Sequence, residues 1–219
     1  MIPHNGELTA DDFPSPGSNF NLVVINEQVV VNCFLTGTGI ATANGDVAVE
    51  DLARGDFLLT PSGSTVPIRW IGRQTVSTRF AAAERLTPVR IRAGALSQGL
   101  PTRDLTLTAD HALLIDGLLI NAGALVNGTS IAFVPLSDLG DSYTVYHIET
   151  ETHDVILAEG VPAETYIDYI GRQAFDNYDE YVALYGASCR IVESTAPRIT
   201  AARQLPAALR ARLGIDRAA

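Results

Sequence analysis

The sequence predicts an all-β fold, because short runs of valine, isoleucine, leucine and threonine recur along most of the chain. Turn-forming pairs separate these runs at regular intervals, and this spacing favours a compact all-β domain over βαβ units. The 219 residues allow one domain of ordinary size with appendages, and a hydrophobic content of 47% supports a sizeable core. The separating pairs are Asn44-Gly45, Gly55-Asp56, Ser62-Gly63, Asp116-Gly117 and Asn127-Gly128.

The first part of the chain leads into this β-rich region. Residues 1–18 are polar and rich in proline and glycine, which indicates a loose lead-in. Residues 20–31 predict a strand, a turn at Asn26-Glu27 and a second strand. Cys33 follows almost directly, and from there the β signal is continuous.

Further along the chain, Asp116-Gly117 predicts a tight hairpin. The pair lies between two Leu-Leu-Ile runs, and Asp-Gly favours the turn type that joins two antiparallel strands most closely. The segments Ala81–Arg85 and Ala93–Ser97 predict short helical turns or loop insertions.

After about Ala163 the pattern becomes helical. Tyr178–Tyr185 predicts a short helix with Asp176 as its N-cap. Pro197 is suited to begin a second helix over Arg198–Leu213, where an apolar stripe recurs every four residues. A proline within this second helix can divide it into two pieces. The stripe consists of Leu205, Leu209 and Leu213.

The composition excludes several classes of protein. The formal net charge is −10 and the main body has no basic stripe, which argues against a nucleic-acid binder. No apolar run approaches the roughly 18–20 residues that a membrane span needs. No signal-peptide pattern is visible, so a cytoplasmic location and non-classical secretion both stay open. The two cysteines, Cys33 and Cys189, are too few for a disulfide framework.

Three stretches carry residue types that suit peptide-bond chemistry. The first begins at Cys33, the second is Leu105–Leu114 and the third is Val145–Tyr166. A cysteine that opens a β-rich domain is well placed to attack the peptide bond just before itself, which here joins Asn32 to Cys33. The candidate side chains in the three stretches are Cys33 with Thr38, Thr108 with His111, and His147 with His153.

Such an attack makes three chemical demands. The nucleophile must be deprotonated, because a free thiol is only a few per cent thiolate near pH 7. The amide must lose a resonance that raises a rotation barrier of roughly 18–20 kcal/mol, and the leaving amine must gain a proton. A T-x-x-H turn can place the imidazole of His111 on the scissile nitrogen and the hydroxyl of Thr108 on the neighbouring backbone.

Each of these residues also has an ordinary structural interpretation. A lone cysteine in a β protein is usually a small buried hydrophobe, and a lone histidine is more often structural than catalytic. Cys33, His111, His147 and His153 are legitimate zinc ligands, but their spacing matches no common zinc pattern, so we expect no metal and no cofactor. A cysteine hydrolase acting in trans is a further alternative, although a nucleophile at the first position of a domain points to chemistry in cis.

The order and context of the three stretches resemble the Hint family, the module shared by hedgehog C-terminal domains and inteins. The resemblance is to the bacterial branch outside true inteins, and it extends from Cys33 to Tyr169. The family's opening block, with a first-residue cysteine and a later E-x-L-x-x-G-D turn, is similar to CFLTGTGIATANGDVAVEDLARGD. Its T-x-x-H block is similar to TLTADHAL, and its late block to VYHIETETHDVILAEGVPAE.

This resemblance implies a domain organisation and a set of site residues. The Hint domain would be a compact disc or horseshoe of short strands at residues 33–169, after a flanking segment 1–32 and before a helical extension 170–219. Inteins often carry an acidic residue at the position of His147, which leaves open what deprotonates the nucleophile. The implied residues are Cys33 as nucleophile, Thr108 and His111 as activators of the Asn32–Cys33 bond, His153 of the late block, and Asp110, His147 and Asp154 as auxiliary candidates.

The function that the resemblance implies is autocatalytic N-terminal self-cleavage by an N–S acyl shift. The chain's own N-terminal flank would be the substrate, and water, a thiol or another external nucleophile would resolve the thioester in a single turnover. No His-Asn pair followed by cysteine, serine or threonine occurs after Gly160, so full splicing is not expected. The alternative is a degenerate Hint scaffold that no longer cleaves and acts as a structural or interaction module.

Overall fold

The computed structural model describes residues 32–79, 87–167, 171–186 and 190–215. Strands dominate these residues, and the helices are short, which confirms the predicted all-β fold. The predicted strands at 20–31, the predicted turns at 81–85 and the second cysteine, Cys189, lie outside them. None of the helices in the described ranges is long and apolar enough to cross a membrane.

The first sheet is antiparallel and has the order β11-β7-β8-β1-β12-β6. Its central strand, β1, is the short strand that follows Cys33, so residues far apart in the sequence meet on both sides of the cysteine. The strands of this sheet are β1 (Phe34–Leu35), β6 (Trp70–Ser77), β7 (Val89–Ile91), β8 (Leu105–Leu107), β11 (Ile131–Phe133) and β12 (Ser142–Glu149).

The second sheet has the order β15-β10-β9-β14-β13-β2-β4-β5, and β3 pairs with β2 beside this path. All its pairs are antiparallel except β10 with β15, which are parallel. Its strands are β2 (Gly39–Thr42), β3 (Gly45–Ala48), β4 (Phe57–Leu59), β5 (Thr65–Pro67), β9 (Ala112–Ile115), β10 (Leu118–Asn121), β13 (Val155–Ala158), β14 (Val161–Glu164) and β15 (Arg198–Ile199).

The hairpin predicted at Asp116-Gly117 is confirmed as the connection between β9 and β10. Ile115 pairs with Leu118, so the loop contains only the two predicted residues. Both have positive φ angles, 52° for Asp116 and 79° for Gly117, as the tight turn that Asp-Gly favours requires.

The first predicted helix is confirmed as α2 (Tyr178–Tyr185), but its N-cap is Asn177 rather than Asp176. The carboxylate of Asp176 accepts the backbone N–H of Thr75 at 2.7 Å instead, which ties the start of α2 to β6. Short 3-10 turns complete the helical segments: η2 (Val49–Asp51), η3 (Ser97–Gly99), η4 (Ala122–Leu125), η5 (Leu136–Asp138), η6 (Arg172–Ala174) and η7 (Ala202–Gln204).

The second predicted helix is wrong over its first half. Only α3 (Ala207–Leu213) is α-helical, and it begins directly after Pro206, because proline has no N–H to donate and is tolerated only at a helix start. The residues predicted to open the helix form β15 instead, where they satisfy backbone groups at the free edge of β10. The predicted leucine stripe is buried, at Leu205, Leu209 and Leu213.

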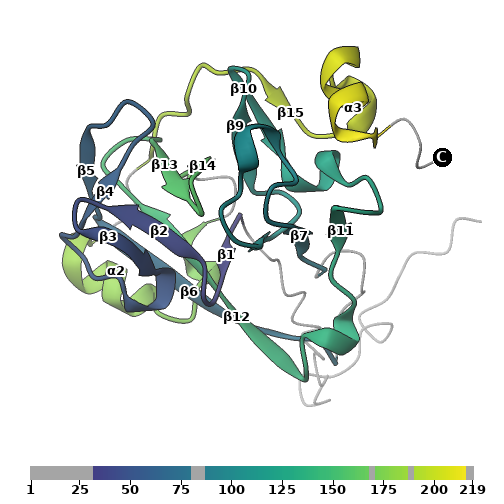
Figure 1. The fold of residues 1–219 in the computed structure, drawn as a ribbon. Coiled ribbons are helices and arrows are strands. Elements are labelled where there is room, and N and C mark those ends of the chain that lie inside the picture. The colour runs from purple at the N-terminus through teal and green to yellow at the C-terminus, as the bar shows by residue number, and fades with distance from the viewer. Residues whose placement is uncertain (1–31, 80–86, 168–170, 187–189, 216–219) are drawn as a thin grey trace, which may run out of the picture.

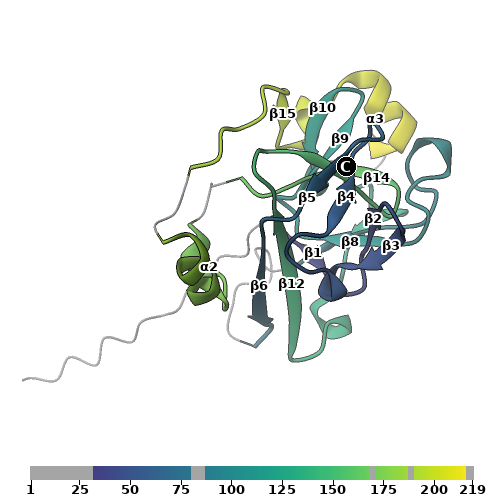
Figure 2. The same ribbon diagram turned by 90° about the vertical axis from the view of Figure 1, so that its left-hand side faces the viewer.

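The α-helices α2 and α3 of the described residues lie at opposite ends of the molecule. In Figure 1, α3 lies beside β10 and β15, whereas α2 lies near β3 and β6. The view in Figure 2 places α2 beside β6, again away from α3. The leucines of α3 belong to the larger hydrophobic core, while Tyr181 of α2 packs into a smaller core that also holds Cys33 and Trp70.

Candidate active site

Cys33 lies between two strands that carry predicted site residues. The pairs Phe34–Leu107 and Phe34–Tyr146 fix the register of β1 with β8 and β12. Extending both registers by one residue places Cys33 opposite Thr108 on one side and opposite His147 on the other. The opening block, the T-x-x-H block and the late block therefore meet at the residue that follows the Asn32–Cys33 bond.

Thr108 holds both backbone groups of Cys33. The N–H of Cys33, which belongs to the Asn32–Cys33 peptide bond, donates to Thr108 Oγ1 at 2.8 Å. The backbone N–H of Thr108 in turn donates to the Cys33 carbonyl oxygen at 3.0 Å. These two hydrogen bonds fix the orientation of the amide nitrogen in a buried setting, where they are shielded from water.

His111 returns to the same place through a tight turn. Its backbone N–H donates to the Thr108 carbonyl oxygen at 3.1 Å, which closes the T-x-x-H turn between β8 and β9. The imidazole is fully buried and stacks obliquely on Phe34, with ring centroids 4.3 Å apart. Its Nε2 lies 3.1 Å from the carbonyl oxygen of Glu164, and because a carbonyl only accepts, Nε2 must carry the hydrogen.

The remaining nitrogen of His111 is therefore free to act as a base. Nδ1 makes no hydrogen bond of good geometry with any residue that the structure describes, although a backbone group of Cys33 lies close enough to raise the pKa of His111. Burial lowers the pKa of His111, and this effect outweighs the nearby Glu164 carboxylate, which raises it. The imidazole is thus neutral near pH 7, with a lone pair available to accept a proton.

The Cys33 thiol is fully buried, and burial raises its pKa well above the usual value. The thiol is therefore protonated at rest, and an attack by its sulfur requires a base within the site. Within the described residues, the Cys33 thiol is not part of a disulfide.

His147, on β12, occupies an apolar cage beside the other two residues. Its ring centroid lies 5.9 Å from that of His111 and 5.0 Å from that of Tyr166. Neither ring nitrogen makes a hydrogen bond within the described part of the chain. Burial, reinforced by the neighbouring His111, lowers the pKa of His147 well below its usual value, so this ring is neutral as well.

Glu164, at the end of β14, is a residue of the site that the sequence analysis missed, as is its partner Arg198. Its buried carboxylate accepts hydrogen bonds from Asn32 Nδ2 at 3.0 Å and from the Ala112 backbone N–H at 2.9 Å. It also pairs with His153 Nε2 at 3.1 Å and with the guanidinium of Arg198. Burial raises the pKa of Glu164, but the hydrogen bonds from His153 and Arg198 outweigh it and lower the value to about 2.

His153 joins the site through Glu164. Its Nδ1 accepts the backbone N–H of Ser194 at 3.0 Å, which leaves Nε2 to carry the hydrogen that faces the carboxylate. Arg198, on β15, completes this cluster and also donates to Asn121 at 3.3 Å. The stretch after residue 169 therefore contributes contacts to this cluster.

In the described contacts, the two auxiliary aspartates form hydrogen bonds with residues other than Cys33 and His111. Asp110 is exposed and accepts a long hydrogen bond, 3.4 Å, from Asn121 Nδ2. Asp154 accepts the hydroxyl of Thr152 at 2.9 Å. Thr38 of the opening block is buried and donates its hydroxyl to the carbonyl oxygen of Leu35 at 2.7 Å, which stabilises the turn after β1.

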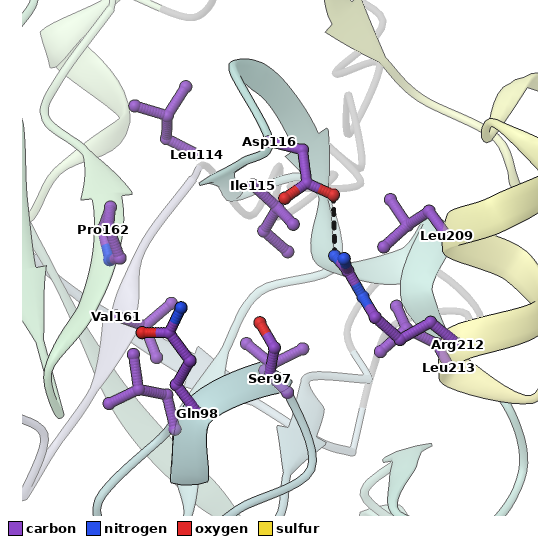
Figure 3. A pocket seen from close by; sticks show the side chains of 12 residues that line it. Ser97, Gln98, Leu114, Ile115, Asp116, Val161, Pro162, Leu209, Arg212 and Leu213 are labelled. Carbon is purple, nitrogen blue, oxygen red and sulfur yellow. Dashed lines mark hydrogen bonds and ion pairs between the residues drawn. The ribbon is translucent and has the colours of Figure 1, made fainter.

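Two cavities lie away from this cluster. The first, of about 160 Å³, is formed by the β9–β10 hairpin, η3, β14 and α3, and the Asp116–Arg212 ion pair lies at its edge (Figure 3). The second, of about 480 Å³, lies among η2, β6 and α2. In the ranges that the structure describes, no group of three or more cysteine, histidine or acidic side chains is arranged to hold a metal ion.

Comparisons with known proteins agree with this arrangement. A family model described as Hint domain matches residues 32–169. No curated protein matches the chain significantly in sequence. Similar solved structures include inteins and an intein-like domain of low sequence identity.

In three of these structures the match covers almost all of the solved chain. The MchDnaB-1 intein (N145AA) is 19% identical, with a TM-score of 0.45 and coverage of 61% of this chain and 99% of that one. A bacterial intein-like domain from Clostridium thermocellum is 16% identical, with a TM-score of 0.47 and coverage of 62% and 100%. A DnaB intein from Synechocystis sp. PCC 6803 is 11% identical, with a TM-score of 0.44 and coverage of 63% and 100%.

Proposed function

The chain belongs to the Hint domain family, and we propose that it cleaves its own backbone between Asn32 and Cys33 through an N–S acyl shift. The observation that carries this proposal is the hydrogen bond from the Cys33 N–H to Thr108 Oγ1, at 2.8 Å. It ties the nitrogen of the proposed scissile bond to the T-x-x-H turn, whose histidine has an unprotonated Nδ1.

In the proposed reaction, Nδ1 of His111 takes the proton of the Cys33 thiol as the sulfur attacks the carbonyl carbon of Asn32. The carbon–sulfur bond forms, the bond from that carbon to the Cys33 nitrogen breaks, and His111 returns the proton to the nitrogen. The products of this step are a thioester at Asn32 and a free amine on Cys33. Water or a thiol then resolves the thioester and releases residues 1–32.

Thr108 has a different role on each side of this step. Before attack, its Oγ1 holds the amide N–H, so the nitrogen presents one defined face to the incoming proton. After attack, the same oxygen accepts a hydrogen bond from the new amine, and this bond is stronger once the amine becomes an ammonium. Thr108 therefore favours the broken bond over the intact one.

The test is cleavage of the purified chain in the presence of dithiothreitol. We expect release of residues 1–32 and a fragment that begins at Cys33, both identified by mass. Thr108→Val retains the shape of the side chain but removes the acceptor, so cleavage should slow about tenfold or more. Cys33→Ala should abolish it. If only the 219-residue mass persists at several pH values, cleavage is not the function.

One observation favours the second candidate, a Hint scaffold that no longer cleaves. The Cys33 thiol is fully buried and its pKa is raised, as expected for an inert core cysteine. A scaffold of this kind would show no mass change with thiol. It would also show no difference between the wild type and Cys33→Ala beyond a small change in stability.

A further inference from the structure

The side chain of Asn32 is held inside the protein. It is 7% exposed, although it precedes the first strand of the domain. Its Nδ2 donates to Glu164 Oε1 at 3.0 Å. Residue 32 is the acyl side of the proposed scissile bond, so this contact fixes the part of the substrate whose carbonyl carbon would be attacked.

We propose that Glu164 is a positioning residue that selects a hydrogen-bond donor in the side chain of residue 32. This inference rests on the proposed cleavage and names the substrate feature that the site would require. Glu164 touches none of the reacting atoms, and it acts through the two groups that it holds.

The carboxylate of Glu164 favours a hydrogen-bond donor in the side chain of residue 32. An ionised carboxylate only accepts hydrogen bonds. Its remaining capacity is taken by the Ala112 N–H, by His153 and by Arg198, all of which are donors fixed by the fold. An apolar side chain at residue 32 would remove one hydrogen bond to this buried anion, and an acidic one would bring a second negative charge against it.

Glu164 also links residue 32 to the base. Its carboxylate holds the side chain of Asn32, while its backbone carbonyl oxygen holds Nε2 of His111 at 3.1 Å. Because one residue fixes both groups, the acyl carbon and the free nitrogen of His111 are kept in register. Misplacing either by about 1 Å is enough to slow such a reaction roughly 100-fold.

Arg198 orients the carboxylate of Glu164 that holds the side chain of residue 32. Its guanidinium contacts both carboxylate oxygens from β15, outside residues 32–169 that match the family model. The pairing of β15 with β10 positions Arg198. The recognition of residue 32 is therefore shared between the Hint region and the segment that follows it.

Two substitutions of similar size at residue 32 test the inference. Asn32→Leu removes the donor, and thioester formation should slow about tenfold or more at every pH. Asn32→Asp can donate only when protonated, so it should be slower still near pH 7. As the pH falls, the rate of Asn32→Asp relative to the wild type should rise, whereas that of Asn32→Leu should stay constant. Equal rates for all three proteins would overturn the inference.

Glu164→Gln provides the reciprocal test. In this background the disadvantage of Asn32→Asp relative to Asn32→Leu should disappear, because the second carboxylate is gone. Arg212→Gln is the matched control, since it breaks an arginine–carboxylate pair on α3 and should leave the preference at residue 32 unchanged. If Glu164→Gln fails to fold, the pH dependence of the two residue 32 variants still decides.

A measurement without cleavage separates this inference from the proposed function. In a Cys33→Ala background, the free energies of unfolding of Asn32→Leu, Glu164→Gln and the double variant give the coupling between the two side chains. If the wild type never cleaves but the coupling is present, the proposed function fails and recognition of Asn32 by Glu164 stands. If the coupling is absent, the recognition fails whether or not the wild type cleaves.

Discussion

Two buried glutamate–arginine pairs join the Hint region to the residues that follow it. Glu164 pairs with Arg198, and Glu149 pairs with Arg172 near α2, where the Arg172 guanidinium lies over the ring of Tyr166, a neighbour of His147. Each glutamate ends a strand, and each carboxylate is fully buried. The chemistry of the two pairs is the same, but their neighbours differ.

The neighbours indicate what each pair does. The carboxylate of Glu164 is surrounded by donors, one of which belongs to the residue before Cys33. The guanidinium of Arg172 lies 4.6 Å from the ring centroids of both Tyr166 and Tyr181, and its Nε donates to Glu149 at 2.6 Å. In the proposed reaction the first pair positions reacting groups, whereas the second connects α2 to the sheet. Substitutions should separate an effect on cleavage from an effect on stability.

The largest expected effect is on the rate of cleavage. His111→Ala should slow thioester formation by about 10²–10⁴-fold, because a positioned proton-transfer group typically contributes that much. His147→Ala should be much milder, since neither of its ring nitrogens makes a hydrogen bond within the described residues. The rates of appearance of the cleaved fragment, compared by mass spectrometry, check this. Equal and mild effects of the two substitutions would contradict the role given to His111.

Arg172→Met should have the largest effect on stability. Removing one partner of a fully buried ion pair typically costs about 3–5 kcal/mol, and here it would leave Glu149 with the more distant Arg69, at 3.6 Å, as its cation. Urea unfolding measures this loss, and the rate of cleavage in the folded state should stay close to that of the wild type. A cleavage rate of folded Arg172→Met well below that of the wild type would show that the two pairs do not have separate roles.

Arg198→Gln should show the opposite pattern. The Arg198 side chain is 16% exposed, so water can replace part of the pair and the loss of stability should be smaller, about 1–3 kcal/mol. Cleavage should nevertheless slow more than in Arg172→Met, because Glu164 loses its orientation. Arg212→Gln serves as the control, since its pair with Asp116 is exposed and worth about 0–1 kcal/mol.

The ionisation of Glu164 should make stability depend on acidity. Its pKa is lowered from 4.5 to about 2 in the folded protein, a difference that corresponds to about 3 kcal/mol. Because the folded value lies below the unfolded one, this contribution is complete above about pH 4.5 and is lost as the pH falls toward 2. The fall in unfolding free energy over that range should be larger for the wild type than for Glu164→Gln. Parallel curves would show that Glu164 is not held ionised.

The smallest effect is expected at the second cysteine. Cys189→Ala should leave both the cleavage rate and the melting temperature nearly unchanged, because in the proposed reaction Cys33 acts as a free nucleophile and not as half of a disulfide. A disulfide would instead cost about 2–5 kcal/mol on loss of either cysteine. Counting thiols in the denatured, unreduced protein distinguishes the two cases, with two free thiols expected.

Local signals in the sequence were enough for the elements that depend on near neighbours. The Asp116-Gly117 hairpin and α2 follow from turn chemistry and from apolar spacing, which act within a few residues. The convergence of Thr108 and His111 on one place also follows, because a three-residue spacing closes a tight turn. The prediction of the second helix was wrong at residues 198–199, because β15 pairs there with β10. Helix propensity within the segment does not reveal such a long-range pairing.

Glu164 could not be assigned in the same way. Its partners come from four separate stretches of the chain, and the strand pairing brings them together only in the folded protein. One local signal was nevertheless present: Glu164 is an acidic residue that directly follows Val161-Pro162-Ala163 and precedes Thr165 and Tyr166 in an otherwise uncharged stretch. A charge within a buried strand needs partners, and this one finds them at the site.

The most direct test of the account is to trap the thioester with hydroxylamine. A thioester at Asn32 would react to give residues 1–32 with a C-terminal hydroxamate, which mass spectrometry distinguishes from a free carboxylate. We predict that the wild type gives this hydroxamate together with a fragment that begins at Cys33, and that Cys33→Ala gives neither. An intact 219-residue chain after prolonged treatment, or an equal yield of fragments from Cys33→Ala, would contradict cleavage through Cys33.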